Sequence, residues 1–212
     1  MTTNQMRADL ILSYNRQAEQ RNQGEIENWK EAERSAFLSL LKSEEKQSLL
    51  EVGAGHGRDS KFFQENGFQV TCIDLSPEMV RLCQQKGLDA RVMDMIDLDF
   101  PAHSFDAVYS LNSLLHLPKK ELPTVLQNIG RVLKANGLFF LGIYGGYDFE
   151  GIWETDSYIP KRFFSFHSDE GLKQVVTESF ELLSFNQIVS GDGELHFQSL
   201  TLRKPVTYRL SH

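Results

Sequence analysis

Short apolar runs alternate with amphipathic segments along most of this chain of 212 residues. The runs have the length of buried strands, and the segments between them place apolar side chains three or four positions apart, as on one face of a helix. The pattern predicts strands near 49–52, 69–74, 90–94, 104–113, 138–144, 180–189 and 194–203, and helices near 5–23, 27–41, 58–66, 77–86, 120–134 and 168–179. Strands that alternate with helices indicate an α/β protein with a mostly parallel sheet.

The end of the chain departs from this alternation. Two β-rich runs, 180–189 and 194–203, are joined by Ser190-Gly191-Asp192-Gly193, which is a strong hairpin signal. Parallel neighbours need a long crossover and cannot be joined by a tight turn. The sheet is therefore expected to include an antiparallel strand at the end of the chain.

The most informative local pattern is a strand that leads through alternating glycines into a helix. Gly53, Gly55 and Gly57 follow the apolar run 49–52, and a helix is predicted from Arg58. Glycines at the carboxyl end of a strand let a ligand approach the backbone, and the start of the next helix offers free N–H groups. A dinucleotide fingerprint would need glycine or alanine where Arg58 stands. The acidic Glu51 suits a cofactor with a cationic end, such as S-adenosylmethionine.

This segment resembles motif I of the class I S-adenosylmethionine-dependent methyltransferases, whose pattern is E/D-x-G-x-G-x-G. The spacing of the following residues strengthens the resemblance. Asp74 ends the next strand, 74 − 53 = 21 residues beyond Gly53, where a carboxylate can accept hydrogen bonds from ribose hydroxyls. Ser76 and Pro77 then start a helix, and residues 73–79 match the family's motif II. The alternative is an ordinary capped helix with Asp74 as a solvated turn residue.

The resemblance implies a set of cofactor contacts. Asp94 would accept the adenine amine and the backbone of Met95 would bind the ring, whereas Asn112 and Ser113 would lie near the methionine portion. Tyr14 resembles a tyrosine that approaches the methionine carboxylate from an N-terminal helix. The full predicted set is Tyr14, Glu51, Gly53, Ala54, Gly55, Gly57, Arg58, Asp74, Leu75, Met79, Asp94, Met95, Asn112 and Ser113. The alternatives are a surface acid for Asp94, core packing for Tyr14 and surface pairing for Arg58.

The family's architecture completes the expected fold. Class I methyltransferases finish with an antiparallel final strand, so we expect a three-layer, doubly wound, mostly parallel sheet of seven strands with the last one reversed. One domain is expected, with a helical cap over 1–35, a cofactor-binding core over 36–145, an acceptor-site loop over 146–168, and the last helix and terminal hairpin over 169–212. The resemblance covers roughly 36–203.

The acceptor is expected to bind over an aromatic-rich stretch. Residues 144–167 hold far more aromatic side chains than the 11% of the whole chain, and such a loop can close over a small, partly apolar molecule. The predicted acceptor-binding residues are Tyr144, Trp153, Tyr158, Arg162 and His167, and His116 is the candidate base. The alternatives are rings that bury the loop against the sheet and histidines with structural roles. The sequence Ser110-Leu111-Asn112-Ser113 lacks the D/N-P-P-Y/F signature of DNA and protein-glutamine methyltransferases.

The composition restricts the kinds of binding partner and the cell compartment that we expect for this chain. The formal net charge of −7 disfavours a nucleic-acid partner, and the apolar run 138–144 is too short to span a bilayer. The polar start of the chain predicts no signal peptide. Cys72 and Cys83 are interpreted as buried thiols, and no cysteine–histidine cluster has metal-ligand spacing. We therefore expect a cytoplasmic, soluble monomer or homodimer without a metal.

The favoured function is transfer of a methyl group from S-adenosylmethionine to an O, N, S or C atom of a small-molecule acceptor. One alternative is a domain that binds the cofactor without catalysis and serves as a regulatory or assembly subunit. Another is a methyltransferase that modifies tRNA or protein, which the acidic charge disfavours. Arg58 and the terminal hairpin argue against an NAD-dependent oxidoreductase.

Overall fold

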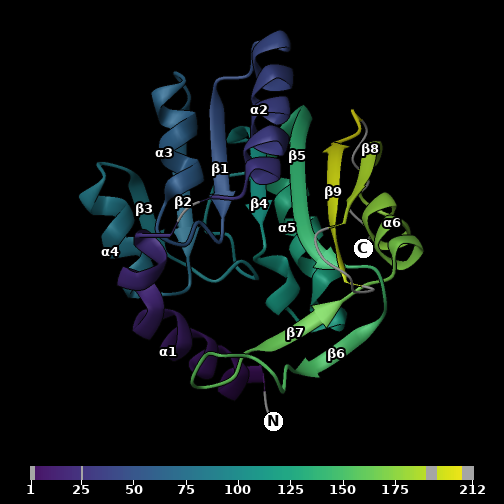
Figure 1. Ribbon diagram of the computed structural model, residues 1–212. Helices are drawn as coiled ribbons and strands as arrows, with labels where there is room; N and C mark the ends of the chain where they lie inside the picture. The colour runs from purple at the N-terminus through teal and green to yellow at the C-terminus, as the bar shows by residue number, and fades with distance from the viewer. Residues whose placement is uncertain (1–2, 25, 190–194, 207–212) are drawn as a thin grey trace.

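The computed structural model describes residues 3–24, 26–189 and 195–206 (Figure 1). Its helices are α1 Thr3–Asn22, α2 Asn28–Ser43, α3 Arg58–Glu65, α4 Pro77–Gln85, α5 Leu122–Val132 and α6 Asp169–Thr177, with short 3₁₀ helices η1 Leu114–His116 and η2 Lys119–Glu121. Its strands are β1 Ser48–Val52, β2 Gln69–Asp74, β3 Asp89–Val92, β4 Phe105–Leu111, β5 Leu133–Gly145, β6 Phe149–Ile152, β7 Phe163–Phe166, β8 Glu181–Ile188 and β9 His196–Arg203.

Seven of the strands form one sheet in the order β3-β2-β1-β4-β5-β9-β8. The strands from β3 to β5 are parallel, whereas β9 runs antiparallel to both β5 and β8. The doubly wound sheet with a reversed last strand is thus confirmed; the predicted turn at 190–193 lies outside the described residues. The chain order reverses between β1 and β4, so the carboxyl ends of these two strands form the switch point where such sheets bind ligands.

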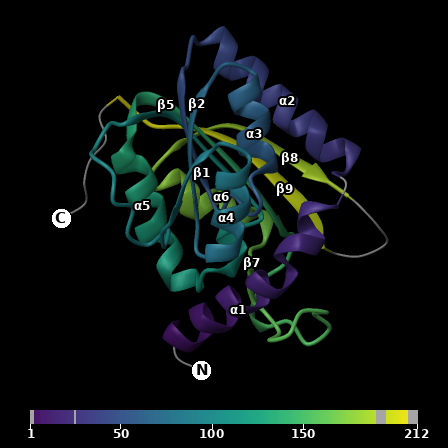
Figure 2. The same cartoon turned by 90° about the vertical axis from the view of Figure 1, so that its left-hand side faces the viewer.

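Helices cover both faces of the sheet (Figure 2). Neighbouring residues of β1 show why, because Leu49 packs with Phe37 and Phe63 of α2 and α3, whereas Leu50 packs with residues of α5 and α6. Side chains of a strand alternate between faces, so a strand that is apolar at successive positions must be buried on both. Each fully buried side chain of this size contributes about 1.5–3 kcal/mol to folding. These two cores hold the strand ends in place.

Two elements lie beyond the carboxyl ends of the parallel strands, α1 and the hairpin of β6 and β7 (Figure 1). Helix α1 packs on α4 through Ala18, Met79 and Leu82. The hairpin pairs Phe149 with Phe166 and residue 152 with 163. Sequence predicted a loop over 146–168, which is wrong for these two strands. Each strand is four residues long, which is too short to show a strand period in the sequence. Packing between rings, such as those of Phe149 and Phe166, stabilises the pair.

A second difference concerns the start of β5. We predicted a helix to 134 and a strand from 138, but α5 ends at Val132 and β5 begins at Leu133. The strand contains an irregularity, with Asn136 at a φ of 58° and a register shift against β4.

Asp106 of β4 accepts hydrogen bonds from Lys134 and Ser48. Burial raises the pKa of Asp106, but these bonds outweigh it and lower the pKa to about 2, so this carboxylate links β1, β4 and β5.

Candidate functional site

Two overlapping cavities lie at the switch point, with volumes of about 590 Å³ and 520 Å³. Helix α1 forms one wall of both, and the carboxyl ends of β1 and β2 form another. We call the joined space the cofactor cavity. The residues that line both parts are Leu10, Gly53, Asp74, Leu75, Met95 and His116.

The glycine-rich turn gives this cavity its floor. Gly53 has a φ of +75°, and a Cβ there would lie 2.1 Å from the Cβ of Ser113, so no side chain fits between β1 and the end of β4. Gly55 has a φ of +55°, but its Cβ would meet no protein atom within 4 Å. Because Gly55 lines the cavity, the space beside it is available to a ligand.

The carboxylate of Asp74 is held in place by the backbone. One oxygen accepts a hydrogen bond from the N–H of Gly55 and the other from the N–H of Ser76, both at 2.8 Å. Burial raises the pKa of Asp74, and these two hydrogen bonds oppose the rise. Each carboxylate oxygen can accept a further hydrogen bond. Asp74 can therefore accept bonds from vicinal hydroxyl groups in the cavity.

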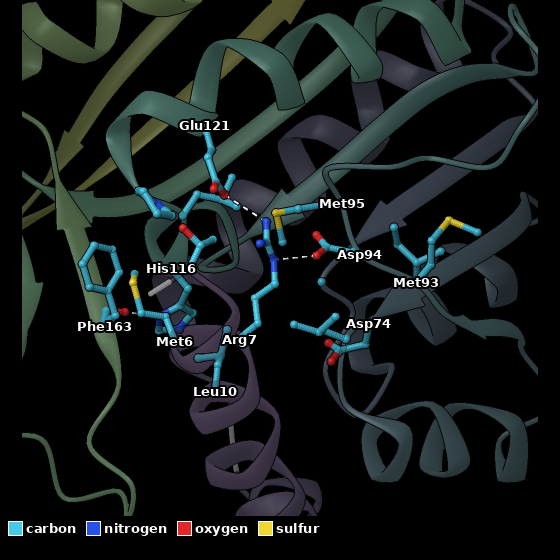
Figure 3. A pocket seen from close by; sticks show the side chains of 16 residues that line it. Met6, Arg7, Leu10, Asp74, Met93, Asp94, Met95, His116, Glu121 and Phe163 are labelled. Carbon is cyan, nitrogen blue, oxygen red and sulfur yellow. Dashed lines mark hydrogen bonds and ion pairs between the residues drawn. The ribbon is translucent and has the colours of Figure 1, made fainter. Parts of the chain in front are cut away.

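Figure 3 shows that Arg7 of α1 lies between two acids at the other end of the cavity. Its Nε is 2.7 Å from Asp94 Oδ2, and its Nη2 is 3.0 Å from Glu121 Oε2. The side chain of Asp94 also accepts a hydrogen bond from the backbone of Ile96. Sequence reasoning missed Arg7 and Glu121, because a contact between residues so far apart leaves no local pattern.

His116 and Tyr14 meet where α1 approaches η1. His116 Nδ1 lies 2.8 Å from the carbonyl oxygen of Phe163, and its Nε2 lies 2.7 Å from the Tyr14 hydroxyl. A carbonyl only accepts, so Nδ1 carries the hydrogen and Nε2 accepts from Tyr14. Burial lowers the pKa of His116 to about 3, against the effect of the Phe163 carbonyl. His116 is therefore neutral near pH 7, with its lone pair bound to Tyr14.

Tyr14 also connects to the segment between β6 and β7. Its oxygen accepts a hydrogen bond of 3.1 Å from Arg162 Nη1. Burial raises the pKa of Tyr14, although the charge of Arg162 opposes the rise. The other side of Arg162 binds Asp156 through Nε and Nη2, at 2.9 and 2.8 Å. One chain of contacts thus ties α1 to the hairpin.

Asn112 follows β4 with a φ of 53°, and its backbone N–H donates to the carbonyl of Gly142 at 2.7 Å. Its side-chain oxygen is buried, and no donor from the described residues reaches it. An unpaired buried acceptor costs about 1–3 kcal/mol. Since Asn112 lines the cavity, a ligand that donates a hydrogen bond there would recover this free energy. Ser113 also lines the cavity, but its hydroxyl donates to the carbonyl of Val52.

A further cavity of about 560 Å³ lies beside the hairpin. We call it the ring cavity, because four aromatic side chains form much of its wall: Tyr144, Trp153, Phe164 and Phe166. Arg162 and Asp156 also line it, and so does Leu115 of η1. The ring of Phe164 lies 4.7 Å from that of His116, which places the ring cavity next to the cofactor cavity.

The comparisons with known proteins agree with this geometry. Residues 50–141 match a family described as a methyltransferase domain. Residues 50–141 therefore belong to a methyltransferase domain. A solved 1,6-didemethyltoxoflavin-N1-methyltransferase from Burkholderia thailandensis, with bound 1,6-didemethyltoxoflavin and S-adenosylhomocysteine, has the same fold, with a TM-score of 0.74 and 22% identity. That match covers 97% of this chain and 91% of the other.

The matches to two curated relatives cover a smaller part of each protein. A phosphoethanolamine N-methyltransferase of Triticum aestivum is 27% identical over 188 residues, which are 85% of this chain and 35% of that protein. A ubiquinone biosynthesis O-methyltransferase of Xanthomonas oryzae pv. oryzae is 39% identical over 101 residues, which are 44% of this chain and 41% of that protein. The matches thus span well under half of the length of these relatives.

The residues present suit the cofactor of this class. The space beside Gly55 leaves room at the backbone, Asp74 can accept from ribose hydroxyls, and the unpaired Asn112 oxygen can accept from an ammonium group. Arg21 of α1 also lines the cavity and could hold a carboxylate. Sequence reasoning missed Arg21, which has no motif around it. A nucleoside with an amino-acid tail therefore fits the charges of this cavity.

Several predicted cofactor residues lie outside the cavity. Glu51 is 2% exposed and accepts a hydrogen bond from Ser60; burial and the nearby Asp59 raise the pKa of Glu51 well above its usual range. Met79 is buried beneath α1. The others are Ala54, which packs against a cluster under α4, and Gly57 and Arg58 at the start of α3. None of these five is among the residues that line the cofactor cavity.

The predicted acceptor residues divide in a similar way. Tyr144, Trp153 and Arg162 line the ring cavity. Tyr158 lies instead beside Arg21, with its hydroxyl accepting from Arg21 at 3.0 Å. His167 is buried outside the cavities, where its carbonyl accepts from Gln198; burial lowers the pKa of its ring.

Two further features concern residues 3–24, 26–189 and 195–206. No group of three or more histidine, cysteine or acidic side chains in this part is placed to hold a metal ion. None of the helices described there combines the length and apolar character needed to cross a membrane. Cys72 and Cys83 are buried free thiols, as predicted.

Proposed function

We propose that this chain binds S-adenosylmethionine in the cofactor cavity and transfers its methyl group to a small-molecule acceptor. The observation that carries the proposal is the joined cavity at the switch point, where Asp74 and Asn112 line one space. The named relatives act on small molecules, which supports the same class of acceptor here. The acceptor atom stays open among O, N, S and C.

The bound cofactor supplies a methyl group that is already activated by a sulfonium. The chain's residues then have simple tasks, which are to align the acceptor and exclude water. Asp74 would hold the ribose, Asn112 the ammonium group and Arg21 the carboxylate. Asp94 would accept from the adenine amine in addition to its bond with Arg7. Helix α1 and the hairpin shield this space because they are tied together through Tyr14 and Arg162.

His116 is the proposed base for the acceptor proton. Tyr14 controls whether the Nε2 atom of His116 is free to accept that proton. Its Nδ1–H is fixed by the Phe163 carbonyl, so Nε2 is the nitrogen that can take a proton. In the structure Tyr14 donates to that nitrogen. An acceptor hydroxyl or amine would have to replace the Tyr14 hydroxyl there, which requires a small displacement of α1.

Calorimetric titration with S-adenosylmethionine, with NAD as control, tests the cofactor. We expect micromolar binding of S-adenosylmethionine alone, on the order of −8 kcal/mol. Release of S-adenosylhomocysteine in the presence of acceptor candidates then tests turnover, and His116→Ala should lower turnover without changing cofactor affinity. Binding of NAD instead would refute the cofactor assignment. Cofactor binding without turnover on any acceptor would favour a non-catalytic subunit.

We also propose a cytoplasmic location and a monomer or homodimer. The two buried free thiols support a reducing compartment. Light scattering after size exclusion measures the oligomeric state; a larger assembly would contradict this part of the proposal.

A further inference from the structure

The ring cavity differs from the cofactor cavity in its charge balance. Of its charged wall residues, Arg162 and Asp156 form a pair whose side chains are 14% and 4% exposed. Asp156 Oδ2 accepts from both the backbone N–H and the Nε of Arg162, and its Oδ1 accepts from Nη2. The remaining terminal nitrogen of Arg162 donates to Tyr14. Both charges are thus already compensated within the protein.

This compensation restricts what can enter. A phosphate or carboxylate would need a guanidinium edge that is free to donate two parallel bonds, but the Nε–Nη2 edge of Arg162 is bound to Asp156 and its Nη1 donates to Tyr14. An ammonium group would need a carboxylate, and that of Asp156 is bound to Arg162. A charged ligand would therefore lose part of its hydration without gaining a partner, which is costly. The cavity favours an uncharged ligand.

The aromatic composition of the wall favours a flat ligand. The ring of Trp153 lies 5.2 Å from that of Phe166 and 6.2 Å from that of Phe164, and the Phe164 and Phe166 rings are 5.7 Å apart. Rings at such distances contact one another, and together they present an aromatic surface on which a planar molecule can pack.

The position of the cavity connects it with methyl transfer. Leu115 lines the ring cavity and the adjacent His116 lines the cofactor cavity. Tyr144 lies at the carboxyl end of β5, beside β4, whose end carries Asn112. A ring bound among these residues would have one edge close to His116.

We propose that the methyl acceptor is an uncharged, planar aromatic or heteroaromatic molecule, and that Trp153, Phe164 and Phe166 bind its ring. Methyl transfer to its hydroxyl or ring nitrogen forms an O–C or N–C bond as the S–C bond of the cofactor breaks, and the acceptor proton passes to a base. This inference rests on the proposed function and names its class of acceptor.

Three probes of equal ring size and different charge test the inference. The wild-type protein, saturated with S-adenosylhomocysteine, is titrated calorimetrically with 2-naphthol, 2-naphthoate and N-methylquinolinium. We expect 2-naphthol to bind at least about tenfold more tightly than either charged probe, because neither charge finds a partner. Equal or tighter binding of a charged probe, or no binding of 2-naphthol below about 1 mM, would overturn the proposal. The same titrations record binding of S-adenosylhomocysteine, so failure of the proposed cofactor site is seen separately.

Variants locate the bound ring. Trp153→Ala should weaken 2-naphthol binding about tenfold and leave S-adenosylhomocysteine affinity unchanged. Ile159→Ala is the matched control, because Ile159 lies in the same segment and is 72% exposed. Unchanged 2-naphthol affinity in folded Trp153→Ala would show that the ring binds elsewhere.

A charge variant tests the role of the ion pair without removing a ring. Asp156→Asn leaves the Arg162 guanidinium without its counter-charge, so 2-naphthoate should bind at least about tenfold more tightly than it does to the wild type. No gain in 2-naphthoate affinity would mean that compensation of Arg162 does not exclude anions from this cavity.

Discussion

Replacement of Gly55 by alanine should separate cofactor binding from folding. The added Cβ meets no protein atom within 4 Å, so it creates no clash inside the protein. It projects from a residue that lines the cofactor cavity, and the methyl would occupy space that the ligand needs. Gly53→Ala would not serve this purpose, because its Cβ would lie 2.1 Å from that of Ser113 and would disrupt the packing of the turn.

The expected loss of stability follows from the backbone conformation of the glycine. Gly55 has a φ of +55°, and an alanine in the left-handed region costs about 1–2 kcal/mol. For a domain of this size that lowers Tm by roughly 2–8 °C. Gly87 has a φ of +76°, also with no atom within 4 Å, and it does not line the cofactor cavity. Gly87→Ala therefore carries the same strain without touching the ligand.

Calorimetry with S-adenosylmethionine and thermal unfolding should be measured on the wild type, Gly55→Ala and Gly87→Ala. We expect similar losses of stability in the two variants, but a loss of affinity of at least about tenfold, or 1.4 kcal/mol, only in Gly55→Ala. Gly55→Val should abolish binding. Wild-type affinity in Gly55→Ala, or an equal loss in Gly87→Ala, would refute the placement of the cofactor beside Gly55.

Three further predictions concern single side chains. Asp74→Ala should weaken S-adenosylmethionine binding by about 1–3 kcal/mol through lost hydrogen bonds; calorimetry that finds normal affinity would remove Asp74 from the ribose site. Burial lowers the pKa of His116 to about 3, so its contribution to stability is complete above the unfolded pKa of 6.5 and is lost as the pH falls toward 3. Urea unfolding at about pH 7 and about pH 5 should show the wild type losing about 1–2 kcal/mol more than His116→Gln, and equal losses would contradict this burial. Asp59→Asn should destabilise the fold by about 3–5 kcal/mol, because Arg34, 2.7 Å away in a pair with side chains 9% and 8% exposed, would be left as a buried unpaired charge; urea unfolding that shows a loss below about 1 kcal/mol would count against it.

Local patterns predicted the parts of the protein that depend on local geometry. The alternation of apolar runs gave the parallel strands, and the tight spacing of Gly53, Gly55 and Asp74 indicated the switch point. Ser76 caps α4 as expected, since its hydroxyl accepts from the N–H of Met79. These features involve residues close together in the chain, where a period, a cap or a required φ is visible in the residue types.

Other parts were predicted incompletely. The hairpin of β6 and β7 was expected to be a loop, because its strands are too short for a period to be seen. Met79 follows the motif spacing but is buried under α1, and Glu51 bonds with Ser60 instead of facing the cavity. A motif indicates the neighbourhood of a site, but the packing of surrounding helices decides which side chains reach it.

The sequence by itself determined the α/β class, the edge of the sheet where the cofactor cavity lies, and Asp74 as an acid that lines it, because strand period and glycine spacing are local properties. Only the tertiary structure decided the contacts of α1. Arg7 meets Asp94 and Glu121, and Tyr14 meets His116 and Arg162, across separations from 87 to 148 residues along the chain. Such pairs depend on how helix α1 packs over the sheet, since burial and ion pairing depend on distance in space and leave no spacing along the chain.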